Sequence, residues 1–264
     1  MGAIADTDTW LAGLHTSSAR LQRYVSRLSE QDLSQQSFAD DWSIGQVLSH
    51  LGSAAEISTM LVERGIAGDA TGPVRDELLP VWERWNALSA PAQREAWQAA
   101  DARHLRLLDS LSATDRASVK VPYFAGLLTI PAYAGYRLSE QSVHAWDIEV
   151  ALDPAAAIPA EEVGLLWERL DLVVTRFRDH ETLARLAPGQ LLVELTDQNR
   201  TLCVDLAAEL HLLPCEPADP TGSVSGPAEA VLRLVYGRNR PRQDGVQATG
   251  AATLEDVRSL FPGF

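Results

Sequence analysis

Lysine is almost absent from this sequence. Lys120 is the only one, so all other basic residues are arginines, and 36 acidic residues against 22 basic ones give a formal net charge of −14. Binding to nucleic-acid phosphates requires clustered Lys and Arg, which occur here only near the end, at Arg238, Arg240 and Arg242. We therefore expect no nucleic-acid partner. The same charge disfavours anionic membrane surfaces.

Cysteine is also scarce, and the two residues, Cys203 and Cys215, have neither the number nor the spacing of a zinc motif. We interpret both as buried or idle thiols, and neither is a good candidate nucleophile. Any sulfur chemistry in this protein would then have to use a thiol brought in from outside.

Long apolar runs are missing as well. None approaches the roughly 18 residues that span a bilayer, and the stretch from Met1 to Asp6 has no basic segment followed by an apolar core. We expect no membrane partner, no visible secretory signal and, by default, a cytoplasmic location. What is present is a globular composition, 46% hydrophobic and 22% charged, over 264 residues, which is enough for two domains.

The first part of the chain is predicted to be helical, because its apolar residues recur at spacings of three and four. Ser43 and Gln46 form a capping box that predicts a helix start at Ser43, and Pro91 is expected to break the third helical element. Residues 119–126 look extended and can form one lip of a site. The predicted helices cover residues 9–28, the segment from Ser43 onward, 78–88, 92–111 and 130–152.

The pattern changes beyond an expected linker at residues 155–159. After one more helix, strand-type runs flank a hairpin-like turn at 197–200. This predicts an α+β protein of two domains, with an all-helical domain over residues 1–155 and a small α+β domain with a mostly antiparallel sheet over 156–264. The elements expected in the second part are helices at 161–177, 227–236 and 252–261, and strands at 191–195, 202–206, 223–226 and 246–248.

Glu140, His144 and Asp147 lie on one face of the helix predicted over residues 130–152, because they are spaced by four and three. A glutamate and a histidine four apart are a weak metal signal, since the same spacing also gives an ordinary surface pair. His50 lies beside the apolar face of the helix that begins at Ser43, where a packed core histidine is the ordinary alternative. Together, His50, Glu140 and His144 would supply three metal ligands from two packed helices and leave a fourth position open, as in catalytic zinc sites.

Three motifs resemble those of the mycothiol-dependent maleylpyruvate isomerase family. They are Trp42-Ser43 followed by His50-Leu51, the helical segment from Glu140 to Asp147, and Gly237-Arg238 within the α+β tail. The family belongs to the DinB-like superfamily of metal-binding four-helix bundles. The resemblance covers nearly the whole chain, and it implies a C-terminal domain of sterol-carrier-like topology.

The resemblance also implies a chemistry. Zinc held by His50, Glu140 and His144 would bind the thiol of mycothiol as a thiolate, which is sensible because a coordinating divalent cation deprotonates a thiol. The thiolate would add to a small electrophilic substrate, expected to bear a carboxylate. It would then either leave again after a cis-trans isomerisation or stay attached in an S-transfer. The sequence leaves these two outcomes open, together with the identity of the metal.

Further site residues are proposed around this centre. Arg238 is the candidate catalytic and cofactor-binding arginine, whose guanidinium fork would hold a carboxylate bidentately; a solvated basic loop is the alternative. Arg137 and Tyr133 precede Glu140 on its helix and are candidate cofactor-binding residues. Asp147 could be a metal ligand, could orient a ligand histidine, or could do neither. A competing hypothesis for the whole protein is a zinc-stabilised ligand-binding or regulatory module without catalysis.

Overall fold

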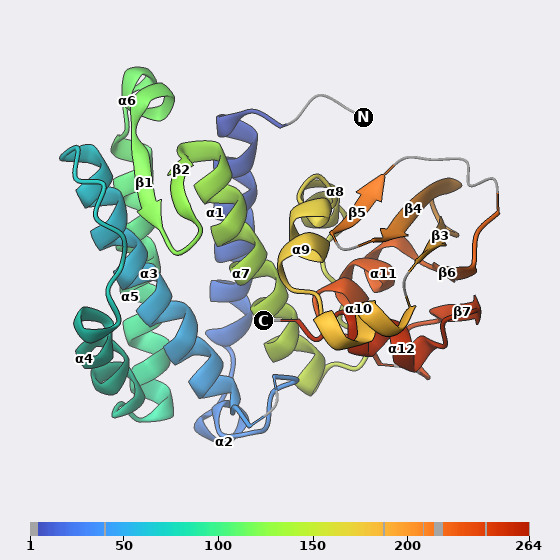
Figure 1. The fold of residues 1–264 in the computed structure, drawn as a ribbon. Coiled ribbons are helices and arrows are strands. Elements are labelled where there is room, and N and C mark those ends of the chain that lie inside the picture. The colour runs from blue at the N-terminus through green and yellow to red at the C-terminus, as the bar shows by residue number, and fades with distance from the viewer. Residues whose placement is uncertain are drawn as a thin grey trace. The chain divides into compact units, whose positions relative to one another are not determined.

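The structure is a computed structural model that describes residues 5–39, 41–186, 188–207, 209–213, 219–240 and 242–263. It divides into two compact units, Ala5–Ile158 and Pro159–Phe264 (Figure 1). The first unit is mainly helical and the second is built around a five-stranded sheet, which confirms the predicted α+β two-domain fold class. Among the described residues, no helix combines the length and apolarity needed to cross a bilayer.

Four long helices form the bundle of the first unit. Helix α3 packs against α5 and α7, and α1 packs against α7 and α5. Their apolar faces meet in a core that includes Leu21, Leu48, Leu51, Trp97 and Ile148, and each fully buried aliphatic side chain contributes about 2 kcal/mol of apolar burial. The bundle helices are α1 (Thr7–Val25), α3 (Ile44–Ile66), α5 (Ala90–Ser110) and α7 (Ile130–Leu152).

Local signals determine where these helices begin. Ser43 caps α3 as predicted: its Oγ accepts a hydrogen bond from Gln46 N, and Gln46 Oε1 accepts one from Ser43 N. The predicted break in the third helical element is present, because residues 75–86 and 90–110 form two separate helices, α4 (Arg75–Asn86) and α5. Pro91 itself lies in the first turn of α5, where an N–H would have no partner in any case, so proline starts this helix and the break comes before it.

Shorter elements surround the bundle. The extended segment predicted at residues 119–126 is one half of a hairpin, in which Lys120 pairs with Thr129 and Tyr123 with Gly126, and this hairpin packs against α3. The second strand was not predicted, because four residues show no usable periodicity. The elements are α2 (Glu30–Leu33), α4 (Arg75–Asn86), α6 (Ala113–Ser118), β1 (Lys120–Tyr123) and β2 (Gly126–Thr129).

The second unit contains a mixed sheet in the order β5-β4-β3-β6-β7, in which only β3 and β6 are parallel. The predicted turn at 197–200 joins β3 to β4, with Asn199 in the left-handed region at φ 48°. Helices α8 (Ala160–Trp167), α9 (Leu170–Arg176), α11 (Ala228–Val235) and α12 (Leu254–Leu260) lie against one face of the sheet and enclose apolar side chains with it. The strands are β3 (Gly189–Leu195), β4 (Arg200–Leu206), β5 (Leu210–Leu213), β6 (Gly222–Gly226) and β7 (Gln247–Gly250).

Three features of this unit differ from expectation. The single helix predicted over 161–177 is two helices, α8 (Ala160–Trp167) and α9 (Leu170–Arg176). Helix α10 (His180–Leu186) and strand β5 were not predicted, and both are short; the other helices are α11 (Ala228–Val235) and α12 (Leu254–Leu260). Cys203 is buried in β4 and disulfide-bonded, so it is not an idle thiol. Cys215 lies outside the described residues.

Candidate metal centre

Two helices of the bundle bring three ligand-type side chains together. His50 comes from α3, and Glu140 and His144 from α7. His50 Nε2 lies 3.2 Å from Glu140 Oε2, and His144 Nε2 lies 3.7 Å from the same oxygen. One ligand atom from each residue lies within 4.8 Å of the others. The i to i+4 spacing on α7 therefore produces the convergence that the sequence predicted.

Asp147 fixes the orientation of His144. Its Oδ2 lies 2.8 Å from His144 Nδ1, and its side chain is fully buried. An ionised carboxylate only accepts hydrogen bonds, so the proton of the neutral imidazole sits on Nδ1 and the Nε2 lone pair faces Glu140. The pKa of His144 is lowered, chiefly because burial disfavours the charged ring. His144 is thus held in the protonation state and tautomer that a metal ligand needs.

Glu140 is anionic in this setting. Burial by itself raises the pKa of its carboxyl, but the hydrogen bond and charge of His50, with the charges of His144 and Arg137, outweigh that effect and lower the pKa to about 2. The side chains of His50 and Glu140 are 33% and 23% exposed, whereas that of His144 is 4% exposed. Solvent therefore reaches the cluster at His50 and Glu140, while its His144 side is closed.

Trp42 forms an aromatic wall beside the cluster. Its ring centroid lies 5.1 Å from that of His50 and 6.2 Å from that of His144. The loop before α3 holds it there: Ser37 N donates to Trp42 O at 2.9 Å, and Asp41 adopts the left-handed φ of 66°. The position of Trp42 beside the histidines was not predicted from the sequence. The available clue was that Trp42 comes directly before Ser43, the residue that caps α3.

Arg137 and Tyr133 are both buried in the bundle, at 1% and 0% exposure. The Tyr133 hydroxyl lies 2.8 Å from His104 Nε2. The hydroxyl of Thr59 donates to Ala55 O, so it accepts from His104 Nδ1 at 3.2 Å. Nε2 is then the acceptor of the neutral ring, and Tyr133 donates its proton to it. His104 lies on the buried face of α5 and was not predicted from the sequence as a partner of Tyr133.

Arg238 belongs to the second unit, in the loop that follows α11, and is 7% exposed. Its Nη1 donates to Tyr236 O at 2.8 Å, and its own carbonyl accepts from Arg233 Nη1 at 2.9 Å. The side chain is therefore not part of a solvated basic loop. Gly237 precedes it at φ 75°, in the left-handed region that glycine tolerates.

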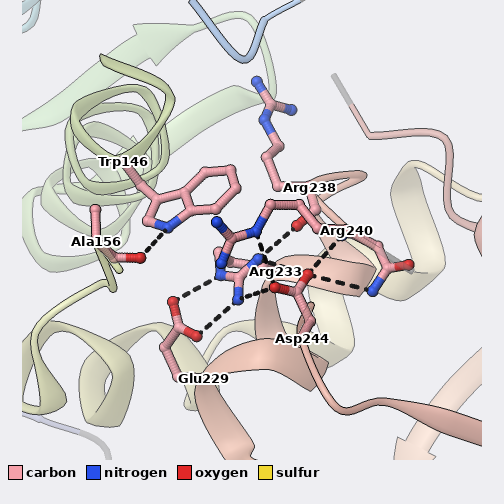
Figure 2. Close-up of polar contacts among 8 residues, drawn as sticks. Trp146, Ala156, Glu229, Arg233, Arg238, Arg240 and Asp244 are labelled. Carbon is pink, nitrogen blue, oxygen red and sulfur yellow. Dashed lines mark hydrogen bonds and ion pairs between the residues drawn. The ribbon is translucent and has the colours of Figure 1, made fainter. Parts of the chain in front are cut away.

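A buried ion-pair network supports this loop (Figure 2). Arg233 donates to both oxygens of Asp244, at 2.9 and 3.0 Å, and its other edge pairs with Glu229. Arg240 Nε also donates to Asp244, at 3.0 Å. The pKa of Asp244 is lowered because hydrogen bonds and charges from Arg233 and Arg240 outweigh its burial. Four charged side chains thus fix the backbone from which Arg238 projects.

Comparison with known proteins identifies the family. The family model described as the mycothiol maleylpyruvate isomerase N-terminal domain matches residues 14–149, which is more than half of the chain and includes His50, Glu140 and His144. The chain belongs to this family. The resemblance predicted from the motifs is thereby confirmed.

Solved structures agree with this family assignment at the level of the fold. The crystal structure of the mycothiol-dependent maleylpyruvate isomerase is 17% identical to the chain, with a TM-score of 0.70 over 93% of each chain. A histidine-to-alanine mutant of that isomerase matches at 16% identity, with a TM-score of 0.69 over 93% of each chain. At such identities the likeness shows a shared fold, which here includes the α+β second unit. No curated protein matches the sequence.

Proposed function

We propose that this member of the mycothiol maleylpyruvate isomerase family is a metal-dependent enzyme. It activates mycothiol as a thiolate for addition to a small electrophile, in a maleylpyruvate-isomerase-like cis-trans isomerisation or an S-transfer. The observation that carries the proposal is the convergence of His50, Glu140 and His144 within 4.8 Å, inside the region that the family model matches.

The donor atoms fit a catalytic zinc ion. Two imidazole nitrogens and one carboxylate oxygen are a ligand set of catalytic zinc sites, which keep the fourth position for water or substrate. Asp147 faces Nδ1 of His144, on the side away from the cluster, so it does not supply a fourth ligand. The same donors suit nickel or cobalt, and zinc is the metal we propose.

The protein's own groups have defined tasks at this centre. Bound zinc would lower the pKa of a coordinated thiol so that the thiol reacts as a thiolate at neutral pH. Asp147 holds the proton on His144 Nδ1 and keeps Nε2 available. Trp42 closes one side of the cluster with an apolar surface and limits water there. Glu140 remains ionised at neutral pH and offers its carboxylate to the metal.

Arg238 is proposed to hold a carboxylate of the electrophile through its guanidinium fork. The metal cluster and Arg238 lie in different units, so this role rests on the family resemblance. The buried network of Arg233 and Asp244 supports it indirectly, because a residue that positions a substrate needs a rigid backbone.

The competing hypothesis of a ligand-binding module finds less support. Helices and sheet of the second unit enclose an apolar cavity, between Trp167 and Val174 on one side and Leu191 and Val224 on the other, but its volume is about 20 Å³. That is room for about one water-sized molecule, far less than a sterol or fatty acid requires. The three-ligand cluster, in contrast, would leave a bound zinc ion one position for a thiol, as catalysis needs.

The proposal is tested by incubating the zinc-loaded protein with maleylpyruvate or with model electrophiles, with and without mycothiol. Turnover that requires both zinc and mycothiol is expected. Recovery of mycothiol unchanged beside a trans product would indicate isomerisation, and loss of free thiol to a stable conjugate would indicate S-transfer. Zinc binding without thiol-dependent reaction on any of these electrophiles would contradict the enzymatic proposal.

A further inference from the structure

Arg137 is a buried cation whose hydrogen-bonding capacity is largely unused. It lies on α7, one turn before Glu140, and is 1% exposed. Among the described residues, its Nε and Nη1 have no hydrogen-bond partner. A guanidinium remains charged in proteins, and a buried charge without hydrogen bonds strongly destabilises the folded state. In the part of the bundle that the structure describes, this unfavourable arrangement lies one helical turn from Glu140 of the metal cluster.

The nearby carboxylates are committed to other groups. Asp101 accepts hydrogen bonds from Ser18 and, at 3.3 Å, from Gln22 Nε2. Glu140 Oε2 faces His50 and His144. Both carboxylates attract Arg137 through their charge, yet neither accepts a hydrogen bond from it. The guanidinium therefore has its charge partly balanced, while its Nε and Nη1 donors have no partner among the described residues.

Tyr123 supplies a second polar group at the same place. It comes from β1, and its ring packs edge-on against Tyr133 at 5.4 Å. Burial raises the pKa of its phenol, an effect partly offset by the charge of Arg137. The phenolic O–H can donate to an acceptor that reaches this corner. Tyr133, by contrast, already donates to His104.

The spacing to the metal cluster limits what can bind. Arg137 and Glu140 are three residues apart on one helical face, about 4.5 Å along the axis. Solvent reaches this corner at Glu140, whose side chain is 23% exposed. A small molecule that approaches the metal there would place its far end one helical turn away, at the guanidinium. Planar paired acceptors, such as those of a carboxylate, fit the guanidinium fork best.

We propose that Arg137 and Tyr123 form a carboxylate-binding subsite beside the metal centre. The electrophile is then a small acid whose reactive carbon lies two or three bonds from a carboxylate. This inference rests on the proposed function, and it gives Arg137 a positioning role that is separate from that of Arg238. A carboxylate in this subsite hydrogen-bonds both the free edge of the guanidinium and the phenol, and holds the reacting carbon near the thiolate.

The test compares Arg137→Met with Arg64→Met in the full-length, zinc-loaded protein. Arg64 is the matched control, because it is already paired with Glu77 at 3.0 and 2.6 Å. The probes are maleate and its neutral dimethyl ester, without thiol, and the readouts are the melting temperature, the dissociation constant by calorimetry and the zinc content.

We expect maleate, but not the ester, to raise the melting temperature of the wild type and of Arg64→Met. Arg137→Met should lose this response and bind maleate at least tenfold more weakly, with unchanged zinc content. Without maleate it should melt no lower than the wild type, because an unsatisfied buried charge has been removed. Tyr123→Phe should also weaken maleate binding, and it provides a second readout if Arg137→Met does not fold.

A lower melting temperature of Arg137→Met together with a wild type that does not respond to maleate would show that Arg137 is a structural cation. Maleate binding that is equally tight in Arg137→Met would also overturn the proposal. Since thiol is absent, these outcomes are independent of the proposed function, which fails if the wild type binds no zinc or no mycothiol.

Discussion

Asp147 is the most informative residue to perturb, because three roles for it were open from the sequence and the structure favours one. Its carboxylate lies 2.8 Å from His144 Nδ1 and is fully buried. In Asp147→Asn the side chain keeps its size but loses its charge. The new amide can accept from Nδ1–H only through a neutral and weaker hydrogen bond, or it can donate to Nδ1 and shift the ring proton to Nε2. The shifted tautomer cannot bind a metal through Nε2.

The expected loss of zinc affinity is about 10-fold to 100-fold, the usual effect of removing the group that orients a ligand histidine. This corresponds to about 1.4 to 2.7 kcal/mol of binding free energy. It should be measured by zinc competition against a chromophoric chelator, with circular dichroism on the same samples to verify folding. Asp109→Asn is the matched control, because Asp109 makes the same 2.8 Å contact with His15 on the exposed surface.

Three results are distinguishable. A loss well above 100-fold would mean that Asp147 is itself a ligand, against the geometry described here. A change below about threefold would mean that it does not orient His144 at all, which would refute the reasoning. A similar loss in Asp109→Asn would show that the effect comes from general electrostatics and not from the local hydrogen bond.

Four further predictions concern other parts of the molecule. His144→Ala should lose both zinc and thiol-dependent activity. Its circular dichroism spectrum and the melting transition of the second unit should be unchanged, because the proposed ligands all lie before residue 150. Global unfolding would show that the metal is structural. Arg238→Lys should lower thiol-dependent kcat/KM at least tenfold, about 1.4 kcal/mol of transition-state free energy, because an ammonium cannot replace a bidentate guanidinium. The zinc content should be unchanged. Wild-type activity in this variant would show that Arg238 is not part of the site. Asp244→Asn should destabilise the second unit by about 2 kcal/mol in urea unfolding, because Arg233 loses its bidentate ion pair with Asp244. An unchanged midpoint would contradict the role of this network. Lowering the pH from 6.5 to 5 should destabilise the wild type through His104, because burial lowers the pKa of this histidine and the unfolded state therefore binds more protons. The contribution of His104 to this loss of stability is at most about 1.4 kcal/mol per pH unit. It should vanish in His104→Gln when the urea midpoints of the two proteins are compared across this pH range.

The sequence predicted best what depends on local pattern. Residues 130–152 form one helix as predicted, because the apolar pattern is long and Asp153-Pro154 ends it. The capping box at Ser43 is also local, and it correctly gave the start of α3. Spacing placed Glu140 and His144 on one face of α7. That His50 of α3 would join them was a hypothesis, which the family resemblance supported.

The parts that could not be predicted depend on tertiary contacts. Strands β2 and β5 have four residues each and acquire their conformation from pairing with a neighbour. Spacing placed Asp147 on the same face as His144, but only the side-chain rotamers show which nitrogen it contacts. The contact between Tyr133 and His104 joins two helices whose register relative to one another no local pattern determines.

The central claim is that His50, Glu140 and His144 hold one metal ion with a position left open for a thiol. The most direct measurement replaces zinc by cobalt in the full-length protein and follows its absorption spectrum during titration with mycothiol. The account predicts one cobalt per chain, a tetrahedral spectrum and a sulfur-to-cobalt charge-transfer band that saturates at one thiol per metal, all lost in His50→Ala. A cobalt site whose spectrum does not change on addition of thiol, or one that persists in His50→Ala, would contradict it.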